Sequence, residues 1–549
     1  MHLRNLVLVA AGAVMGASCS SGSGSGVVDD GLPPDDGGTR DDDDPPPQTL
    51  TAPSVNATSA DGSTTLTWSV VDGASSYAVY WSESPNVTTS NSTQVSNATS
   101  PWTHSALIND RTYHYAVSAA NGSVESELSA EVSATPSASA SPYDPPWASV
   151  TPLRTLTHSY DAGLTQEQNG ANLKSTIAAL APGDRLEVGA GTYSINSLFS
   201  IDRSGTADAP IWIAAAPGTA PILTRPNASQ NAVNLGSNQP TRFVALTGFE
   251  ITGGDTGVRL IDCENVWIDR CHIHDCGNAG ISANSDDTAE LFLTRNEVHA
   301  TGGTAEGMYL GANNSVHVMR DSIIALNHIY DCVGSQGDGI EVKQGSFGNW
   351  IVENLVHDTQ YPCILAYGTD GNARNIIERN ICFNSGDNVV QVQGEAIVRN
   401  NLIMNGAVGF SSHDHQGQTI NLEFVHNTVI NSGRATNLSS WNGRAGMTLA
   451  NNALYSETNN AIRFPNGSNG VEISSNVVFG SVQGTTGGYV VGNGLVDFDD
   501  VTWDGTRRRA IPSAAGSLLG SGDQAWAAVE DLTGTTRTAP LESGCLDRQ

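Results

Sequence analysis

Two carboxylates, a lysine and a tyrosine near the middle of the chain could together carry out proton-transfer chemistry. Asp338 and Glu341 offer oxygen ligands that suit a hard cation such as Ca²⁺. Lys343 can accept a proton and Tyr367 can donate one. Cleavage of a uronate-containing polysaccharide by β-elimination needs a cation to neutralise the carboxylate, a base for the C5 proton and an acid for the leaving O4. The residue types therefore predict Lys343 as base, Tyr367 as acid, and Asp338 with Glu341 as Ca²⁺ ligands.

Other polar side chains could hold a sugar chain by hydrogen bonds. His413 opens a His-Asp-His sequence, which could be a metal pair or a base, or simply a hydrogen-bonded turn at a strand end. Lys343 itself has a plain alternative interpretation, as a solvated lysine on a polar sheet. The candidate substrate-binding residues are Glu306, Asn284, Gln393, His413 and Arg374.

A repeated step indicates the elements that must position these residues. Nine segments of the form Asn-x-apolar, or a near relative, follow one another at spacings of 21 to 31 residues. This period is too short for a domain and suits one coil of a solenoid. The steps begin at Cys271, Asn296, Asn327, Asn354, Asn380, Asn401, Asn427, Asn452 and Asn476.

A second repeated pattern, a short segment in which apolar and other residues alternate, lies upstream of the Asn-x-apolar steps. Alternation of apolar and mixed positions is typical of strands with one face in a core. In register, Glu341 would lie on the same outward face as Lys343, with Tyr367 one strand away from Lys343 and His413 three coils further along. The runs begin at Val258, Ile281, Met308, Ile340, Ile364, Val390, Phe410 and Ile462.

These two patterns predict an all-β parallel β-helix of about ten to twelve coils over residues 151–549. An Asn at each corner tolerates left-handed backbone, and its amide can bond to the Asn of the next coil. The Leu-x-Leu consensus of leucine-rich repeats and the longer repeat of propeller blades are both missing. No Asp-Asp pair falls on the outward columns, which disfavours an inverting hydrolase.

The N-terminal part predicts export. Residues 1–19 have the charge and apolar run of a signal peptide, and Cys19 loosely matches a lipoprotein cleavage site. Lipid anchoring and free secretion therefore both stay open. Residues 20–50 are rich in Ser, Gly, Asp and Pro and predict an extended tether. The net charge of −31 argues against nucleic acid as a partner.

The cysteines form no metal-binding pair of Cys-x-x-Cys motifs. Cys382 falls on an inward position and is expected to be buried filler. In an oxidising compartment the others could form disulfides of undetermined pairing. They are Cys263, Cys271, Cys276, Cys332, Cys363 and Cys545.

Residues 51–136 alternate around Leu66-Thr67-Trp68, Tyr77–Trp81 and Tyr113–Ala119, which predicts a small antiparallel β-sandwich. This segment resembles a fibronectin type III module. The resemblance implies a spacer or a binding unit, and a Ser/Pro-rich linker is expected over residues 137–150.

The start of the solenoid combines an amphipathic segment over Asn172–Leu180 with the sequence Pro182–Tyr193. A helix here would cover the open edge of the first coil. This block resembles the N-terminal cap of the chondroitinase B and alginate lyase family of right-handed β-helix proteins. The resemblance implies a right-handed parallel β-helix.

The segment Asp338–Ser346 resembles the family segment in which acidic metal ligands precede a catalytic Lys. The family then places an Arg on the next coil, where this chain has Leu365 and Tyr367, and Arg374 comes seven residues later. Two functions stay open. One is cleavage of an acidic polysaccharide by β-elimination with Ca²⁺, and the other is non-catalytic glycan binding or adhesion through the same groove.

Overall fold

The computed structural model describes residues 49–60, 62–105, 107, 111–122, 124–136 and 141–548. The chain divides into two compact units, residues 1–139 and 140–549. The predicted signal peptide, Cys19 and nearly all of the tether lie outside the described residues. Within the described part, no helix is long and apolar enough to cross a membrane.

The N-terminal unit contains two antiparallel sheets that share a core around Leu66, Val79 and Tyr115. This agrees with the predicted antiparallel architecture, whereas its assignment as a fibronectin type III module stays a prediction. One sheet has the order β1 (Val55–Ala60), β2 (Ser63–Trp68), β5 (Trp102–His104); the other has the order β4 (Thr93–Ser96), β3 (Ser76–Ser82), β6 (Tyr113–Asn121), β7 (Val124–Glu125), with β8 (Val132–Ala134) beside β6.

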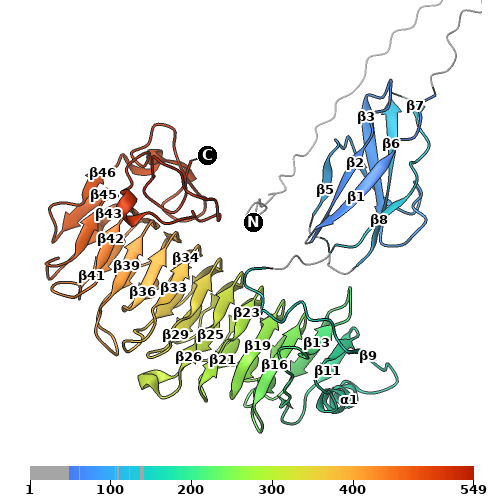
Figure 1. Cartoon of the computed structure of the whole chain (residues 1–549), viewed down its shortest axis with the longest axis horizontal. Helices are drawn as coiled ribbons and strands as arrows, with labels where there is room; N and C mark the ends of the chain where they lie inside the picture. Colours follow the sequence, from blue (N-terminus) through green and yellow to red (C-terminus); the bar gives the residue numbers. More distant parts are fainter. Residues whose placement is uncertain are drawn as a thin grey trace, which may run out of the picture. The chain divides into compact units, whose positions relative to one another are not determined.

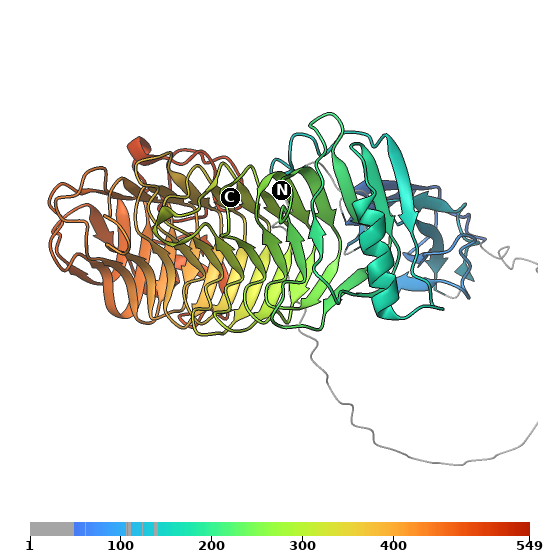
Figure 2. The same ribbon diagram turned by 90° about the horizontal axis from the view of Figure 1, so that it is seen from below.

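The second unit is a solenoid of parallel strands, seen along its length in Figure 1 and from below in Figure 2. The first solenoid sheet follows the path β9 (Arg154–His158), β10 (Asp184–Val188), β13 (Ile211–Ala215), β16 (Thr241–Thr247), β19 (Cys263–Asp269), β23 (Phe292–Thr294), β27 (Ile323–Ala325), β30 (Trp350–Val352), β33 (Asn375–Glu378), β36 (Ala396–Arg399), β39 (Leu422–Val425), β42 (Thr448–Ala450) and β44 (Glu472–Ser474), with β22 (Thr288–Ala289) and β26 (Met319–Arg320) beside it.

The second and third solenoid sheets complete each coil. The second consists of β11 (Gly191–Ser194), β14 (Pro221–Arg225), β17 (Glu250–Gly253), β20 (His272–His274), β24 (Glu297–Thr301), β28 (His328–Cys332), β31 (Leu355–Thr359), β34 (Ile381–Ser385), β37 (Leu402–Met404), β40 (Thr428–Asn431), β43 (Ala453–Arg463), β45 (Asn476–Gln483) and β46 (Tyr489–Val491). The third consists of β12 (Ser200–Ile201), β15 (Val233–Leu235), β18 (Val258–Leu260), β21 (Ile281–Ala283), β25 (Met308–Leu310), β29 (Ile340–Val342), β32 (Ile364–Ala366), β35 (Asn388–Val392), β38 (Val408–Ser412) and β41 (Arg434–Leu438).

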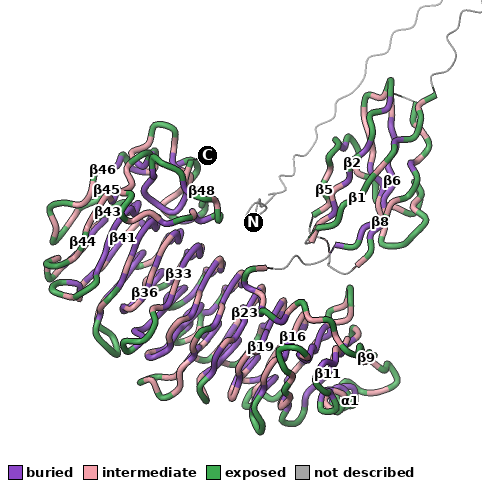
Figure 3. The backbone as a smooth tube through the Cα atoms, viewed as in Figure 1, coloured by how far each residue is buried: buried purple, intermediate pink, exposed green. Residues whose placement is uncertain are grey.

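The prediction of an all-β parallel β-helix is therefore confirmed, with slightly more coils than expected. Thirteen strands form the second sheet, against ten to twelve predicted coils. Figure 3 shows that buried residues concentrate on the strands, whereas the turns between them are largely exposed. One continuous apolar core runs from Leu173 to Val478, so each coil is stabilised by its neighbours.

The predicted asparagine ladder is present at the corner between the first and second sheets. The side-chain amide of Asn380 donates to the Asn401 oxygen at 3.0 Å, and Asn354 donates to Asn380 at the same distance. The same contact joins successive asparagines from Asn296 to Asn476. These buried amides satisfy one another and fix the register of the coils.

The left-handed residue at this corner is not the asparagine, as predicted, but the residue before it. The φ angles of these preceding residues lie between 50° and 59°. The ladder asparagine lies directly before the next strand, except Asn476, which is the first residue of β45. The left-handed residues are Arg270, Arg295, Leu326, Glu353, Arg379, Asn400, His426, Asn451 and Ser475.

The predicted column of outward residues is correct as far as Ser411 and then misses one strand. Ser411 pairs with Asn437 of β41, and the run at Ile462 belongs to β43 of the second sheet. The segment that begins at Arg434 lacks the apolar alternation of a strand, because Thr436 takes the inward position that Phe410 occupies one coil earlier. Its hydroxyl is satisfied by the Ala461 carbonyl at 2.9 Å.

A helix covers the N-terminal end of the solenoid, and the C-terminal segment packs on its side. Helix α1 (Gln166–Ala178) starts with a capping box between Thr165 and Gln168 and buries Leu173 and Ile177 against the first coils, as predicted. The C-terminal segment includes η3 (Gly494–Asp497), β47 (Phe498–Val501), β48 (Arg508–Pro512) and η4 (Gln524–Trp526). Its apolar residues pack against β34, β37, β40 and β43, so this segment covers the outer face of the second sheet.

The structure also differs from the sequence-based expectations for the linker and for the cysteines. The predicted linker 137–150 is not simply a spacer, because Tyr143 and Trp147 are buried against the outer face of the first sheet. Tyr143 also donates a hydrogen bond to Glu353 at 2.7 Å. The seven cysteines between Cys263 and Cys545 are all buried and unpaired, and Cys382 lies in the core as predicted.

Candidate functional site

A polar cavity of 540 Å³ lies on the outer face of the third sheet, over the strands β29, β32, β35 and β38. Its walls come from these strands and from two loops around Asn313 and Gln416, whose side chains hydrogen-bond to each other at 3.2 Å. The lining residues are Asn313, Gln336, Asp338, Glu341, Lys343, Tyr361, Pro362, Leu365, Tyr367, Asp387, Asn388, Gln391, His413, His415 and Gln416.

The strand register places the predicted catalytic residues side by side. Glu341 lies between Tyr309 and Leu365 in the sheet. Lys343 and Tyr367 each follow a strand and continue the ladder, since the Tyr367 amide donates to the Val342 carbonyl at 3.0 Å. Lys343 therefore lies outside the core and lines the cavity, as the sequence pattern predicts.

The Lys343 ammonium is held tightly in this cavity. It donates a hydrogen bond to the Glu341 carboxylate and lies 4.6 Å from the centre of the Tyr309 ring and 5.3 Å from that of Tyr367. Only 4% of Lys343 is exposed, because these rings and Glu341 surround it. Lys343 is thus a buried, paired cation rather than the solvated lysine of the alternative interpretation.

Electrostatics in the cavity favour a charged lysine. Burial lowers the pKa of Lys343, but the Glu341 carboxylate and the Tyr309 phenol outweigh burial, so the net pKa is raised. Burial raises the pKa of Tyr367, and the charges of Glu341 and Asp338 add to this. The Tyr367 phenol therefore keeps its proton at neutral pH, the form that a general acid needs, although the raised pKa makes it a weaker donor.

The two predicted metal ligands are also buried. Burial raises the pKa of Asp338 well above its usual value, and the nearby charges of Glu341 and Glu306 raise it further. Burial likewise raises the pKa of Glu341 despite the contact with Lys343. The Asp338 Oδ1 atom is buried without a hydrogen-bond partner, which leaves it free for a ligand. The assignment of Asp338 and Glu341 as ligands of a Ca²⁺ ion stays a prediction.

The His-Asp-His sequence contributes to the cavity wall and to a turn. His413 and His415 line the cavity, and the His415 ring stacks on Tyr367 with 5.3 Å between ring centres. Asp414 accepts hydrogen bonds from the Thr419 backbone and from Arg444, so it shapes the loop. The turn interpretation therefore holds for Asp414 only. The two histidines face the cavity.

The remaining predicted binding residues lie outside the cavity lining. Glu306 is buried and accepts a hydrogen bond from Thr304 at 2.6 Å, close enough to Asp338 to affect its pKa. Asn284 and Gln393 each keep a buried side-chain oxygen without a partner. Arg374 forms an ion pair with Glu423 of β39 at 2.6 Å, so the structure does not bring it to the cavity.

Sequence reasoning did not single out Tyr309 and Gln391 as site residues. Both fall in the predicted outward column, and Tyr309 pairs directly with Glu341. Gln391 accepts a hydrogen bond from Asn388 at 2.8 Å, and both line the cavity. Their position in the strand register could have identified them as site residues. Residues at equivalent positions of neighbouring strands point to the same side of the sheet as Glu341.

Comparisons with solved structures find matches of low sequence identity. Pectate lyase Pel9A is 16% identical with a TM-score of 0.44, and the match covers 73% of this chain and 98% of that one. An alginate lyase from Paenibacillus sp. str. FPU-7 is 18% identical with a TM-score of 0.36, over 61% and 97% of the two chains. A mannuronic acid specific polysaccharide family 6 lyase from human gut microbiota is 11% identical with a TM-score of 0.43, over 62% and 91%.

No curated protein matches the sequence. The model of the right handed beta helix region matches residues 227–374, the part of the chain that supplies Asp338, Glu341, Lys343 and Tyr367. The match covers part of the second unit, which the parallel register of its three sheets shows to be a parallel β-helix.

Proposed function

We propose that this protein is a lyase that cleaves a uronate-containing polysaccharide by β-elimination. The observation that carries the proposal is the Lys343 amine, held between two phenols at the wall of a polar cavity on an outer strand face. The chain contains only two lysines, and Lys343 is the buried one. A long acidic polymer lying across the strands would meet a base, an acid and several amides.

Lys343 must lose its proton before it can act as a base. The Glu341 carboxylate, in direct contact, is the group that can take this proton, because burial disfavours both charges of the pair. The neutral amine then removes the C5 proton while the Tyr367 hydroxyl protonates O4. The C4–O4 bond breaks as the C4–C5 double bond forms, and the extra proton on Lys343 is returned to the Tyr367 phenolate.

The substrate carboxylate requires positive charge during this step. A Ca²⁺ ion bound by Asp338 and Glu341 would supply it. Asp338 would offer the oxygen without a protein partner, and Glu341 would offer its second oxygen, because its first oxygen takes the proton from Lys343. Asn388 and Gln391 on the same wall can donate or accept hydrogen bonds to sugar hydroxyls.

The test is to incubate the purified chain with alginate, pectate and glycosaminoglycans, with and without Ca²⁺, and to follow the ultraviolet absorbance of the unsaturated uronate product. We expect product with at least one acidic polysaccharide. Binding without product on every substrate would instead support the glycan-binding alternative. One observation favours that alternative, namely the raised pKa of Lys343 beside Glu341, which opposes a free amine.

We also infer that the protein is exported and that residues 51–136 form a fibronectin type III spacer. The strand order β4-β3-β6 beside β1-β2-β5, the N-terminal signal-like sequence and the acidic net charge support this inference. Expression in a bacterial host with fractionation and mass spectrometry of the mature N-terminus tests export, and a mature chain starting at a modified Cys19 would establish the lipid anchor.

A further inference from the structure

The outer face of the second sheet carries an unusual concentration of histidines. Along this sheet each inward apolar residue is flanked by two outward ones, and the early coils place His272 and His274 on β20 and His299 on β24. The C-terminal segment covers the same face only from β31 onward, as its apolar contacts begin at Leu355 and Phe383. The histidines are therefore half-buried but open to solvent.

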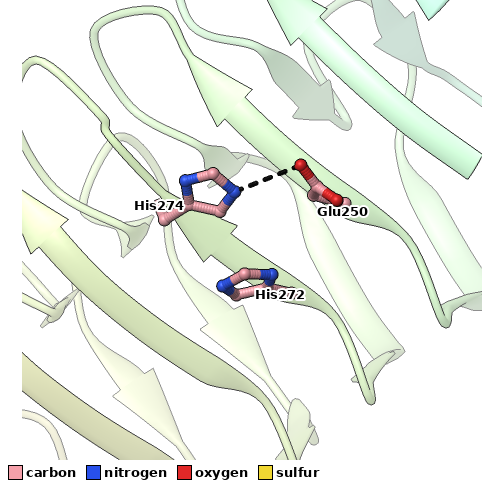
Figure 4. A group of neighbouring side chains, drawn as sticks. All are labelled: Glu250, His272 and His274. Carbon is pink, nitrogen blue, oxygen red and sulfur yellow. Dashed lines mark hydrogen bonds and ion pairs between the residues drawn. The ribbon is translucent and has the colours of Figure 1, made fainter. Parts of the chain in front are cut away.

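Two overlapping groups of side chains on this face have the spacing of metal ligands. Glu250, His272 and His274 form one group, and His272, Glu297 and His299 form the other, each with its ligand atoms within 4.8 Å of one another. Figure 4 shows that Glu250 and the two histidines of β20 converge from adjacent strands. His272 belongs to both groups.

Electron-rich atoms face one another here. The Asp275 carboxylate contacts the His274 Nδ1 atom at 2.8 Å, which fixes the proton on that nitrogen and leaves Nε2 with a lone pair. That Nε2 atom faces the Glu250 carboxylate at 3.4 Å. Two atoms that both present a lone pair repel each other at this distance. The contact is stable only when a cation or a proton lies between them.

The contact between His272 and His299 has the same character. Their Nε2 atoms lie 2.8 Å apart, so at most one proton can occupy the space between them. Neutral imidazoles are the form that binds metals.

We propose that this face binds one divalent transition-metal ion, with His272 as the central ligand and either Glu250 with His274 or Glu297 with His299 completing the site. Imidazole nitrogens with one carboxylate select Zn²⁺, Cu²⁺ or Ni²⁺ over Ca²⁺. The site lies on the second sheet, whereas the polar cavity lies on the third. Because its ligands come from successive coils, the bound ion joins strands β17 and β20 or β20 and β24.

Zinc titration of the untagged full chain after treatment with a chelator tests the proposal. Isothermal titration calorimetry should give one equivalent of tight Zn²⁺ binding, and Zn²⁺ should raise the melting temperature. His272→Gln should weaken binding at least 100-fold. Glu250→Gln or Glu297→Gln should weaken it about tenfold or more, and the one that does so identifies the carboxylate ligand.

His357→Gln is the matched control, because His357 lies on the same face but in neither ligand group. It should bind Zn²⁺ as the unchanged chain does. His413 and His415 remain in all variants, so binding at the cavity would be common to all of them. If His272→Gln fails to fold, the double variant Glu250→Gln/Glu297→Gln, at half-buried surface positions, replaces it.

Absence of Zn²⁺ binding to the unchanged chain would overturn the proposal, as would equal affinities of His272→Gln, or of the double variant, and His357→Gln. Cobalt substitution gives an independent readout, since a site with three protein ligands should show the visible bands of four- or five-coordinate Co²⁺. None of these measurements needs a polysaccharide, so their outcome is separate from that of the proposed lyase activity.

Discussion

Lys343 donates a hydrogen bond to Glu341 two residues earlier on the same strand edge, and the two side chains are enclosed by the rings of Tyr309 and Tyr367. Strand alternation puts residues i and i+2 on the same face, so the pair is a direct consequence of the local sequence. Breaking a buried pair by removing one partner leaves an uncompensated charge. The pair is therefore the feature on which function and local stability both depend.

Replacing Lys343 by alanine should abolish product formation if it is the base. We expect kcat/KM on the preferred acidic polysaccharide to fall about 100-fold or more, the usual contribution of a general base. Lys174→Ala is a matched control, because it removes the only other lysine, on helix α1 far along the chain from the cavity. Equal activity of the two variants, measured by ultraviolet absorbance, would rule out Lys343 as the base.

The ion pair also predicts how the amine reacts. Because Glu341 raises the pKa of Lys343, the neutral amine is scarce, and acetylation by acetic anhydride at pH 8 should be slower at Lys343 than at Lys174. Glu341→Gln removes the charge that opposes burial, so the pKa of Lys343 should fall and its acetylation should become several-fold faster. Peptide mass spectrometry measures both rates in one sample.

An unchanged Lys343 rate in Glu341→Gln would show that access, not charge, limits the reaction. The Lys174 rate serves as the internal reference in both proteins. This experiment needs no substrate and therefore tests the resting state of the cavity on its own.

The repeat in the sequence predicted which residues share the cavity, but not how deeply they are buried. Register alone places Tyr309, Glu341 and Leu365 in one row, because parallel strands keep one spacing. The loops at Asn313 and Gln416 that help to enclose the cavity have no period, so their contact could not be predicted. For this reason the sequence left open the alternative of a solvated Lys343.

Other differences have similar physical causes. Strand β41 was not predicted because Thr436 occupies an inward position. A polar residue in a sequence indicates an exposed position, whereas the Thr436 hydroxyl is buried and hydrogen-bonded. The C-terminal segment has no alternation, and its contact with the second sheet depends on apolar residues far apart in the chain. By contrast, the outward direction of His272 and His274 could have been predicted from the ladder step at Cys271, because they flank the inward Ile273, but the sequence analysis did not single them out.

The asparagine ladder should make a measurable contribution to stability. In Asn380→Ala, the buried Asn354 amide loses its acceptor at 3.0 Å and the Asn380 contact with Asn401 is removed. Leaving buried polar groups unpaired costs about 1–3 kcal/mol each, so we expect a loss of about 3 kcal/mol in the free energy of unfolding. Urea denaturation measures it, with the exposed Asn372→Ala as control. If Asn380→Ala loses no more free energy of unfolding than Asn372→Ala, the ladder does not stabilise the fold.

Buried His426 should make the solenoid sensitive to acid. Burial, and to a smaller extent the nearby Arg537, lower its pKa to about 3. Between this value and the ordinary value of about 6.5, the unfolded chain binds a proton that the folded chain does not. The contribution of His426 is thus complete above pH 6.5 and is lost as the pH falls toward 3, by about 1.4 kcal/mol per pH unit.

His426→Gln removes this titration while keeping a polar side chain that can meet the Asn451 amide, which lies 3.0 Å from the His426 Nε2 atom. Urea denaturation of both proteins at pH 4.5, 5.5, 6.5 and 7.5 should show a shallower loss of stability for the variant below pH 6.5 and parallel curves above it. Since the His426 ring is surrounded by the backbone of Glu542 and Gly544, the same titration should loosen the C-terminal segment first. Limited proteolysis at pH 4.5 should then cut the unchanged chain within residues 494–548 sooner than the variant. Identical slopes and identical cleavage would show that His426 is not charged on unfolding in this range.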